Sequence, residues 1–312
     1  MKEENRIREF WREDKKRFFY SALHSIISKT FLTYICPDSL YLKFFYYKRF
    51  GKKLDLKNPL TLNEKLQWLK LNNRKDIYTR MVDKVRVKDY VREKIGDQFI
   101  IKTLGVWDRF DDIDFDTLPN QFVLKCNHDS GNYIICPDKA KLDKEKAKNI
   151  LEKALKKNFF YTGREWPYKN VKPKILAEEF IGKDGKVPED YKLMCINGVF
   201  DNIMVCTDRQ SGTTKYYFFD KAWKLIRCNK WGELAPQDFS LEKPEKFDTM
   251  VEIAEKLSYD IPLTRIDLYE VDGKIYFGEI TFFPNSGFDT NLYYQEDLRL
   301  GQKLDLKKVG RN

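Results

Sequence analysis

The residues best suited to chemistry are Arg265, Asp267, Glu279 and Thr281, near the carboxyl end of the chain. Their stretch, residues 264–284, reads TRIDLYEVDGKIYFGEITFFP, two runs rich in β-branched and aromatic residues around an Asp-Gly turn, which predicts a β-hairpin. Pairing of Asp267 with Glu279 would put two carboxylates on one face, with Cβ atoms about 5 Å apart. Such a pair repels unless a cation neutralises it, and oxygen ligands favour Mg²⁺ or Mn²⁺. The alternative is a surface hairpin with scattered charges.

This alignment depends on the length of the turn. A three-residue loop over Asp272–Lys274, with its glycine in the left-handed conformation, pairs Val271 with Ile275 and brings Asp267 opposite Glu279. A two-residue Asp-Gly turn would shift the register by one residue and break the alignment, because neighbouring side chains on a strand point to opposite faces. We therefore expect the three-residue loop.

The hairpin resembles the metal-binding strands of ATP-grasp ligases, relatives of D-alanine–D-alanine ligase and biotin carboxylase, in which Arg-x-Asp precedes Glu-x-Asn and a proline. The resemblance implies Mg²⁺ on Asp267 and Glu279, next to the phosphates of ATP, and Arg265 stabilising acyl-phosphate chemistry. Thr281 stands where the family usually has asparagine as a third metal ligand. The segment GEITFFP, residues 278–284, resembles the TupA-like ATP-grasp group, which is associated with teichuronopeptide and capsular polysaccharide synthesis in bacteria.

A second polar cluster lies in residues 122–135, FVLKCNHDSGNYII, where two apolar strands flank a turn-rich loop. The N–H groups of such a loop could cradle phosphates. By resemblance, Lys125 at the end of the first strand contacts the α- and β-phosphates, and Ser130 and Gly131 bind the same nucleotide. His128 is expected to face solvent in this loop and donate to a phosphate; the alternative is a structural histidine.

The next two strands resemble the nucleotide-binding hinge of ATP-grasp proteins. Residues 174–182, KILAEEFIG, predict a buried strand leaving a subdomain. In the family, a glutamate and the following backbone amides bind adenine there, and the matching positions are Glu178, Glu179, Phe180 and Ile181. Residues 190–200 predict a hairpin with a type I′ Asn-Gly turn. Asp190 matches an acidic ribose contact, and Lys192 shares its strand face.

Helical patterns account for much of the remaining chain. Capping-box spacing at Thr61 and Glu64 starts one helix, and a second is expected over residues 78–95. Many ATP-grasp enzymes carry an Asp-Lys pair at the start of that second helix, so the resemblance makes Lys84 a phosphate ligand. The alternative for Lys84 is a solvated surface lysine.

Composition limits the class of protein. The chain has 312 residues, which is long enough for two or three subdomains, and a net charge of +10, which favours polyanionic partners such as a nucleotide, an acidic glycan or an anionic membrane. No nucleic-acid recognition motif is present. Six cysteines without CxxC spacing and two histidines argue against zinc and for reduced thiols in a cytoplasm.

The amino-terminal region has an apolar stretch over residues 18–36. Residues 1–17 alternate acids and bases and lack a signal-peptide cleavage site. Polar residues within the stretch make a membrane span unexpected, since a span needs about 20 apolar residues. With Lys15, Lys16 and Arg17 before it and a second basic-aromatic patch over 46–53, it could be an interfacial helix. The alternative is an ordinary core helix.

We therefore expect an α+β ATP-grasp fold, in which two α+β subdomains clamp the nucleotide and a mostly helical part covers one end. The expected segments are residues 1–75 (helical), 76–119 (α/β), 120–182 (central subdomain) and 183–312 (catalytic subdomain). The resemblance covers residues 58–294.

The expected activity is an ATP-dependent carboxylate–amine ligase acting through an acylphosphate. It would join an amino acid or another amine to a carboxylate of a bacterial surface glycan or its precursor, in the cytoplasm at the inner face of the membrane. One alternative is an ATP-dependent phosphotransferase. Another is a capsular glycosyltransferase, whose Asp-x-Asp metal pair would be Asp114 and Asp116. A non-catalytic membrane-associated scaffold is the third.

Overall fold

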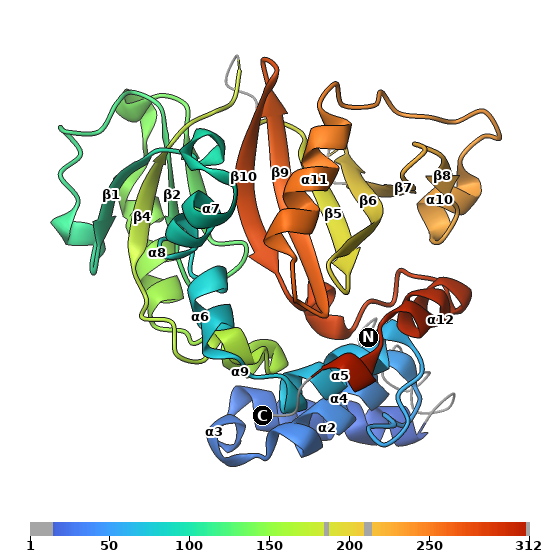
Figure 1. Ribbon diagram of the computed structural model, residues 1–312. Helices are drawn as coiled ribbons and strands as arrows, with labels where there is room; N and C mark the ends of the chain where they lie inside the picture. The colour runs from blue at the N-terminus through green and yellow to red at the C-terminus, as the bar shows by residue number, and fades with distance from the viewer. Residues whose placement is uncertain (1–14, 184–186, 209–213, 310–312) are drawn as a thin grey trace, which may run out of the picture.

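The computed structural model describes residues 15–183, 187–208 and 214–309 (Figure 1). Two antiparallel β-sheets stand beside each other above a layer of helices (Figure 1). That layer joins helices from both ends of the chain, because α12 packs on α5. The expected α+β class is thus confirmed.

The strands fall into two groups along the chain. The first sheet has the order β1-β4-β2-β3 and the second has the order β10-β9-β5-β6-β7-β8. Their bounds are β1 Thr103–Trp107, β2 Phe122–Cys126, β3 Tyr133–Cys136, β4 Ile175–Glu179, β5 Asp190–Ile196, β6 Val199–Thr207, β7 Lys215–Phe219, β8 Leu225–Ile226, β9 Leu263–Val271 and β10 Lys274–Thr281.

Helix α8 packs on the first sheet, α11 packs on the second sheet and on α7, and other helices lie below the sheets (Figure 1). Their bounds are α2 Lys15–Lys29, α3 Leu32–Ile35, α4 Asp38–Phe50, α5 Leu62–Asn72, α6 Asp76–Val82, α7 Val87–Ile95, α8 Lys144–Leu155, α9 Phe160–Gly163, α10 Lys230–Leu234, α11 Phe247–Leu257 and α12 Tyr294–Lys303. A 3₁₀ turn, η6 (Pro284–Gly287), follows β10.

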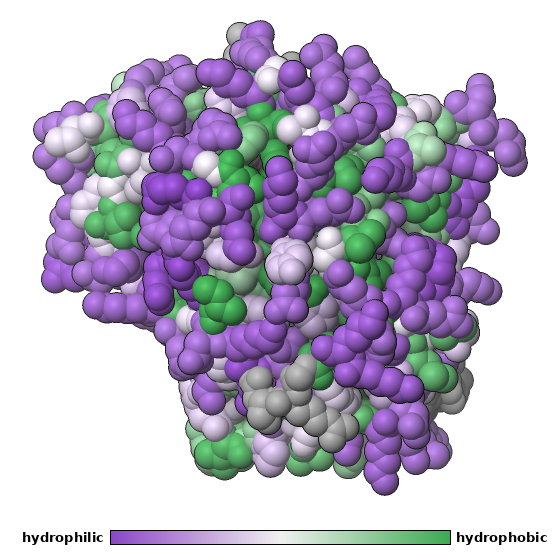
Figure 2. Space-filling model, in the orientation of Figure 1, coloured by the Kyte–Doolittle hydropathy of each residue, from purple (hydrophilic) through white to green (hydrophobic). Residues whose placement is uncertain are grey.

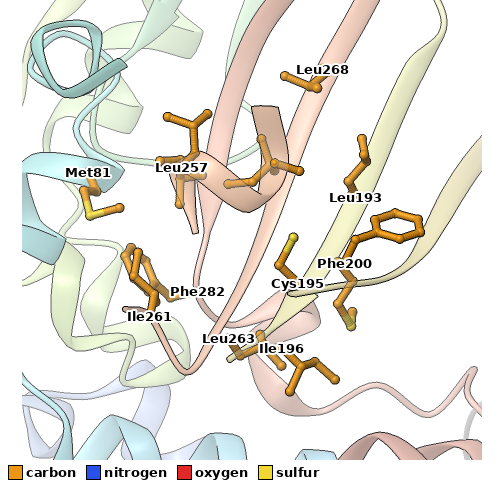
Figure 3. Close-up of a cluster of buried hydrophobic side chains, with 14 of the residues drawn as sticks. Met81, Leu193, Cys195, Ile196, Phe200, Leu257, Ile261, Leu263, Leu268 and Phe282 are labelled. Atoms are coloured by element: carbon orange, nitrogen blue, oxygen red, sulfur yellow. The ribbon is translucent and has the colours of Figure 1, made fainter. Parts of the chain in front are cut away.

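Each sheet buries one face under an amphipathic helix. In the first sheet, Leu124 and Ile175 pack with Leu151 of α8 in one apolar cluster. In the second, alternate residues of β5 and β9 face α11, as Figure 3 shows for Leu193 and Leu268. Because strand side chains alternate, the residues between them point to the opposite face, where the polar groups lie.

The expected helix over residues 78–95 is wrong in one respect, since the chain breaks between α6 and α7. Asp83 causes the break: its Oδ1 accepts from the N–H groups of Val85 at 2.9 Å and Arg86 at 3.4 Å. A short polar side chain that bonds nearby backbone amides competes with the helical hydrogen bonds. Lys84 consequently lies in a turn between two helices.

Other local expectations are confirmed. The capping box of α5 forms, with the Glu64 N–H donating to Thr61 and the Thr61 N–H donating to Glu64. Asn197 and Gly198 have φ angles of 52° and 77°, as a type I′ turn requires. Within the described ranges, no helix combines the length and the apolar character needed to cross a membrane.

Candidate active site

A cavity of about 750 Å³ lies between the two sheets. Strands β2 and β3 contribute one wall, and strands β5, β6, β7 and β9 contribute the other. The predicted site residues that line it are Lys84, Lys125, Ser130, Gly131, Glu178, Glu179, Phe180, Ile181, Asp190, Lys192, Arg265, Asp267 and Glu279. The structure thus brings together residues that are up to 195 positions apart in the sequence (279 − 84).

The turn of the β9–β10 hairpin is shorter than expected. It has two residues, Asp272 with φ 49° and Gly273 with φ 71°, so Lys274 rather than Ile275 pairs with Val271. Both angles are left-handed, which matches the twist of antiparallel strands and is the usual geometry of an Asp-Gly hairpin. The expected three-residue loop is therefore wrong.

The expected alignment is nevertheless confirmed, because a β-bulge at Gly278 inserts one extra residue into β10 and cancels the shift. Asp267 pairs with Glu279, and Arg265 pairs with Thr281. Gly278 fits the bulge because an added Cβ would lie 3.0 Å from the Asp267 carbonyl oxygen.

Arg265 is the centre of this charged face. Its guanidinium donates to both carboxylate oxygens of Asp267, at 2.6 and 2.8 Å, and to Glu279 at 3.3 Å and Thr281 Oγ1 at 3.2 Å. Asp267 is 2 % exposed. Burial by itself raises the pKa of Asp267, but Arg265 and then Lys192 outweigh it and lower that pKa. Asp267 is therefore a carboxylate held ionised by two cations.

Lys192 extends the charged face onto β5. Its ammonium forms ion pairs with Asp267 and, at 2.6 Å, with Asp190, two residues away on the same strand face. Burial alone lowers the pKa of Lys192, but the two carboxylates raise it overall. The shared face predicted for Asp190 and Lys192 is thus confirmed.

The oxygen donors of this face fit a hard divalent cation. Asp267 and Glu279 stand opposite each other, and the Glu279 side chain keeps 31 % of its surface exposed. Among the residues that the structure describes, no group of three or more His, Cys, Asp or Glu side chains gathers as a metal site. Mg²⁺ commonly uses one or two carboxylates together with substrate phosphates, so two carboxylates suffice for that cation.

Lys125 faces the cavity from the end of β2. Its ammonium pairs with Glu178, which lies 4 % exposed on β4 and also pairs with Lys88 at 2.6 Å. Burial by itself raises the pKa of Glu178, but the two lysines lower it. The sequence analysis did not identify Lys88. Its position at the start of α7, four residues after Lys84, could have indicated a second lysine near the cavity.

Lys84 connects the phosphate-binding loop candidate to the hairpin. Its ammonium donates to the Asp129 carbonyl oxygen and lies 3.8 Å from Glu279 Oε2. Asn127 fixes the base of the same loop, since its Nδ2 donates to Asp83 at 2.9 Å and its Oδ1 accepts from the Lys174 N–H at 2.7 Å. The break between α6 and α7 is what brings Lys84 to the cavity.

The expected exposure of His128 is wrong. Its side chain is 2 % exposed, and Nε2 lies 3.2 Å from the Ala154 carbonyl oxygen and 3.0 Å from that of Lys157, at the end of α8. The ring therefore contacts two carbonyl groups at the carboxyl end of α8, one of which, that of Ala154, also accepts from the Lys157 N–H at 3.0 Å. His128 does not line the cavity, and the structural alternative describes it.

The structure also shows a buried polar cluster that the sequence reasoning missed. Lys70 is completely buried and Glu165 is 4 % exposed, behind the charged face. Burial lowers the pKa of Lys70 to about 7, although the Glu165 carboxylate opposes that shift. Lys70 follows an apolar helical stripe, and nothing in that pattern distinguishes it from a surface lysine.

The sequence of residues 64–305 matches the TupA-like ATPgrasp family. No curated protein matches the chain. Among solved structures, D-alanine–D-alanine ligase from Bacillus anthracis complexed with ATP is 14 % identical with a TM-score of 0.42, over 73 % of this chain and 63 % of that one. D-cycloserine synthetase DcsG is 13 % identical with a TM-score of 0.41, over 73 % and 71 %.

The ATP-grasp ligase PsnB with a phosphomimetic variant of its minimal precursor, Mg and ADP is 10 % identical with a TM-score of 0.41, over 80 % of this chain and 67 % of that one. With 63 % of the D-alanine–D-alanine ligase covered, the chain spans less than two thirds of that protein's length. The family match covers well over half of this chain and agrees with the two antiparallel sheets around a charged cavity. The chain belongs to the TupA-like ATP-grasp family.

Proposed function

We propose that the protein is an ATP-dependent carboxylate–amine ligase that works through an acylphosphate. The carrying observation is the single cavity face on which Arg265 joins Asp267 and Glu279, with Lys192 beside them and Lys125 on the opposite wall. Such a face places fixed positive charge and oxygen ligands where phosphoryl transfer needs them, and its main contribution is positioning and charge stabilisation.

In this proposal, ATP lies along the cavity, with adenine at Glu179, Phe180 and Ile181 and ribose at Asp190. Lys84, Lys125, Lys192, Ser130 and Gly131 hold the phosphates. Mg²⁺ on Asp267 and Glu279, or Mn²⁺ in its place, supplies positive charge beside the γ-phosphate. Thr281 supports Arg265, to which its Oγ1 is hydrogen-bonded.

The reaction has two displacements. A carboxylate oxygen of the first substrate attacks the γ-phosphorus, and ADP leaves, which produces an acylphosphate. The amine nitrogen of the second substrate attacks the acyl carbon, phosphate leaves, and the nitrogen loses a proton to form the amide. Arg265 lies beside the developing charge of both steps and stabilises it.

The acceptor in this proposal is a carboxylate of a bacterial surface glycan or its precursor, and the amine is an amino acid or a related amine. The net charge of +10 supports an acidic acceptor. The cavity also continues past Arg265 to a wall that contains Pro284, Asn285, Asp289 and Asn291. The polar side chains of Asn285, Asp289 and Asn291 suit a substrate with several hydrogen-bonding atoms.

The geometry bears differently on the alternatives. A phosphotransferase would use the same nucleotide site and differ only in the acceptor atom. A glycosyltransferase with an Asp-x-Asp pair is disfavoured, because Asp114 and Asp116 do not line the cavity and the Asp116 N–H donates to Asp114 at 3.0 Å. That bond is a local turn in an acidic loop.

The proposal includes work at the cytoplasmic face of a membrane, supported by an apolar surface that runs over α2 and α3 to the start of α4. Six of the fourteen large apolar side chains that are exposed in the described residues lie within residues 19–40: Phe19, Ile26, Phe31, Tyr34, Ile35 and Leu40. Figure 2 shows hydrophobic residues along its lower edge, where Figure 1 draws the helical layer. The other face of α2 is core, since His24 and Ile27 are buried.

Charge indicates which surface would cover these side chains. Exposed Lys15 and Lys16 precede Phe19 on α2, and exposed Lys29 ends the helix after Ile26. An apolar stripe between lysines suits an anionic lipid surface. Arg17 is turned inward instead, where it donates to the Lys48 and Arg49 carbonyl oxygens at 3.1 Å.

Phosphorus NMR of ATP turnover tests the proposed reaction. A ligase releases ADP and free phosphate only when a carboxylate and an amine are both present. A phosphotransferase leaves the phosphate on its product, and a glycosyltransferase leaves ATP unchanged. Release of phosphate without an amine, or transfer of phosphate to a stable product, would contradict the ligase.

A further inference from the structure

The buried ammonium of Lys70 lies where three parts of the chain meet. It donates to Gln67 Oε1 at 2.9 Å on its own helix α5, to the Gly163 carbonyl oxygen at 2.6 Å, and to the Ser286 carbonyl oxygen at 2.7 Å. Gly163 lies between α8 and β4 of the first sheet, and Ser286 follows β10 of the second. One side chain thus ties the helical layer to both sheet-bearing parts.

The two loops that Lys70 joins also contact each other. Ser286 Oγ donates to Glu165 Oε1 at 2.5 Å. A Cβ added to Gly163 would lie 2.6 Å from Ser286 Oγ, and one added to Gly287 would lie 2.6 Å from Gln67 Nε2. A Cβ at either position would therefore displace a neighbouring side chain, so the segments approach closely at both glycines.

The η6 turn that Lys70 holds has an unusual backbone. Asn285, Ser286 and Gly287 have φ angles of 49°, 52° and 62°, three left-handed residues in succession. For the two residues that are not glycine, this conformation is strained, because it brings Cβ too close to the following carbonyl oxygen. It persists only where the surroundings fix it, and such strain concentrates at functional sites.

The hydrogen bonds that fix η6 come mainly from α5. Besides Lys70, Gln67 Nε2 donates to the Gly287 carbonyl oxygen at 2.5 Å. Lys70 also lies over the Phe288 ring, 4.6 Å from its centroid. Within the turn itself, the Ser286 N–H donates to the Phe283 carbonyl oxygen at 2.8 Å. Removal of the ammonium would take this donor from the buried Gly163 carbonyl oxygen and leave the Ser286 carbonyl oxygen with only a 3.4 Å bond from Gln67 Nε2, which is costly.

The register of the hairpin shows which end of the cavity η6 borders. Along β9, Tyr269 pairs with Asp190 at the hinge end, and Arg265 pairs with Thr281 at the other end, from which the chain continues to Pro284. Pro284 and Asn285 line the cavity there. If adenine lies at the hinge, as the proposed function states, the η6 end is left for the acceptor substrate.

We propose that Lys70 is a positioning residue that holds the η6 turn as the acceptor-side wall of the cavity. Its ammonium acts through the Ser286 carbonyl oxygen and through the Gly163 loop, and it does not touch substrate itself. Glu165 completes the lock by accepting from Ser286 Oγ. The assignment of this wall to the acceptor rests on the proposed function, whereas the locking of η6 does not.

The chain offers a matched control on the same helix. Lys65 also donates to two backbone carbonyl oxygens, those of Gly301 and Leu304, both at 2.6 Å. These belong to the end of α12, outside the cavity wall. Lys70→Met and Lys65→Met therefore remove the same kind of bond, from the same helix, at different places.

Hydrogen exchange of the full-length variants, followed by mass spectrometry, tests the lock without any acceptor. Lys70→Met should speed exchange of amides 285–288 and 161–165 by about tenfold or more, since the loss of a buried hydrogen bond lowers the free energy of local opening. Lys65→Met should leave those amides unchanged and speed exchange near residues 300–304. Equal exchange of 285–288 in the two variants would overturn the proposal.

Binding and turnover then separate positioning from general damage. Lys70→Met should leave the Kd of ADP with Mg²⁺ within about threefold of the original protein, while kcat with an active substrate pair falls by about a hundredfold, the scale of an ångström misplacement. If ADP affinity fell in parallel with kcat, Lys70 would have a general structural role rather than a specific role in positioning the acceptor-side wall. If no substrate pair is turned over, the ligase proposal fails, but the exchange result still decides the lock.

Should Lys70→Met not fold, Ser286→Ala carries the same test. It removes only the bond from Oγ to Glu165 and keeps the Lys70 ammonium in place. Exchange of amides 285–288 should then rise by a smaller factor. No change in that segment would contradict the lock.

Discussion

At the scale of single residues, the site is held in its charged form before any ligand binds. Asp267 is buried yet ionised because Arg265 and Lys192 pair with it, and Glu178 is buried yet ionised because Lys125 and Lys88 do the same. Such preorganisation removes the cost of assembling charges during the reaction. Removing one member leaves its partner buried and unpaired, so each substitution needs a control for folding.

Asp267→Asn and Glu279→Gln should each abolish turnover that depends on Mg²⁺, because each removes one of the two opposed carboxylates that we propose as metal ligands. Glu270→Gln is the control, a carboxylate on the same strand β9 that does not line the cavity. Turnover and circular dichroism should be measured together. Retention of more than about a tenth of the activity, little over 1 kcal/mol in barrier, would remove the metal assignment.

Lys125→Met should weaken ATP binding or turnover strongly, because Lys125 presents an ammonium to the cavity at the end of β2. Lys88→Met is the control: it also takes one cation from Glu178 but does not line the cavity. Lys125→Arg is not expected to restore ATP binding, since the planar guanidinium of arginine and the compact ammonium of lysine differ in shape. Titration calorimetry with ATP decides the point; equal affinities in the two methionine variants would contradict the role of Lys125.

At the scale of elements, the hairpin and the helices show how local rules combine. The Asp-Gly sequence forms its preferred two-residue turn, and the Gly278 bulge then restores the pairing of Asp267 with Glu279. In the helical layer, α2 and α4 pack through rings: His24 stacks on Phe45 at 4.3 Å between centroids and its Nε2 lies 3.1 Å from Tyr41 Oη. A buried histidine between helices makes their packing sensitive to acid.

Stability of the α2–α4 packing should fall as the pH drops from 6.5 towards 4. Burial, and then Lys48 and Arg164, lower the pKa of His24 from 6.5 to about 4 in the folded protein. The unfolded chain therefore binds more protons between these pH values, and acid favours it. His24→Gln should flatten the dependence of Tm on pH in this window. An unchanged slope in His24→Gln would assign the acid sensitivity to other groups.

At the scale of the whole molecule, the polar cavity and the apolar α2–α3 surface belong to different parts of the fold. The cavity lies between the sheets, and α2 and α3 lie in the helical layer below them (Figure 1). A protein docked through that layer would leave the cavity accessible. The lysines near the apolar side chains would each contribute about 1 kcal/mol on an anionic surface.

Vesicles test this arrangement. Flotation should show binding to phosphatidylcholine vesicles that contain about 30 % phosphatidylglycerol, a loss of binding in high salt, and none to phosphatidylcholine alone. Replacing Phe31, Tyr34 and Ile35 by serine, or Lys15, Lys16 and Lys29 by glutamine, should reduce binding. The control is Tyr259→Ser, which removes a 75 % exposed aromatic side chain beyond α11.

Two outcomes would contradict membrane docking. The protein could ignore anionic vesicles at low salt, or the Phe31, Tyr34 and Ile35 variants could float as well as the original chain. A second copy as the occupant of this surface would appear instead as a concentration-dependent dimer in ultracentrifugation, abolished by the same serine variants.

The sequence by itself determined the features that depend on neighbours along the chain. The Thr61–Glu64 capping box, the Asn197-Gly198 turn and the strands around the 127–132 loop follow from local hydrogen bonding and side-chain alternation. The pairing of Asp267 with Glu279 was also predicted correctly, although the expected loop was wrong and a bulge supplied the missing residue.

Only the tertiary structure decided which polar residues are buried and what they meet. His128 turned to carbonyl groups of α8 rather than to the cavity, and Lys88 and Lys70 became buried partners of segments distant in sequence. A lysine in a helical pattern looks the same whether solvent or a distant carbonyl faces it. Its environment is set by long-range packing, and packing fixed both the lysine pair on Glu178 and the junction at Lys70.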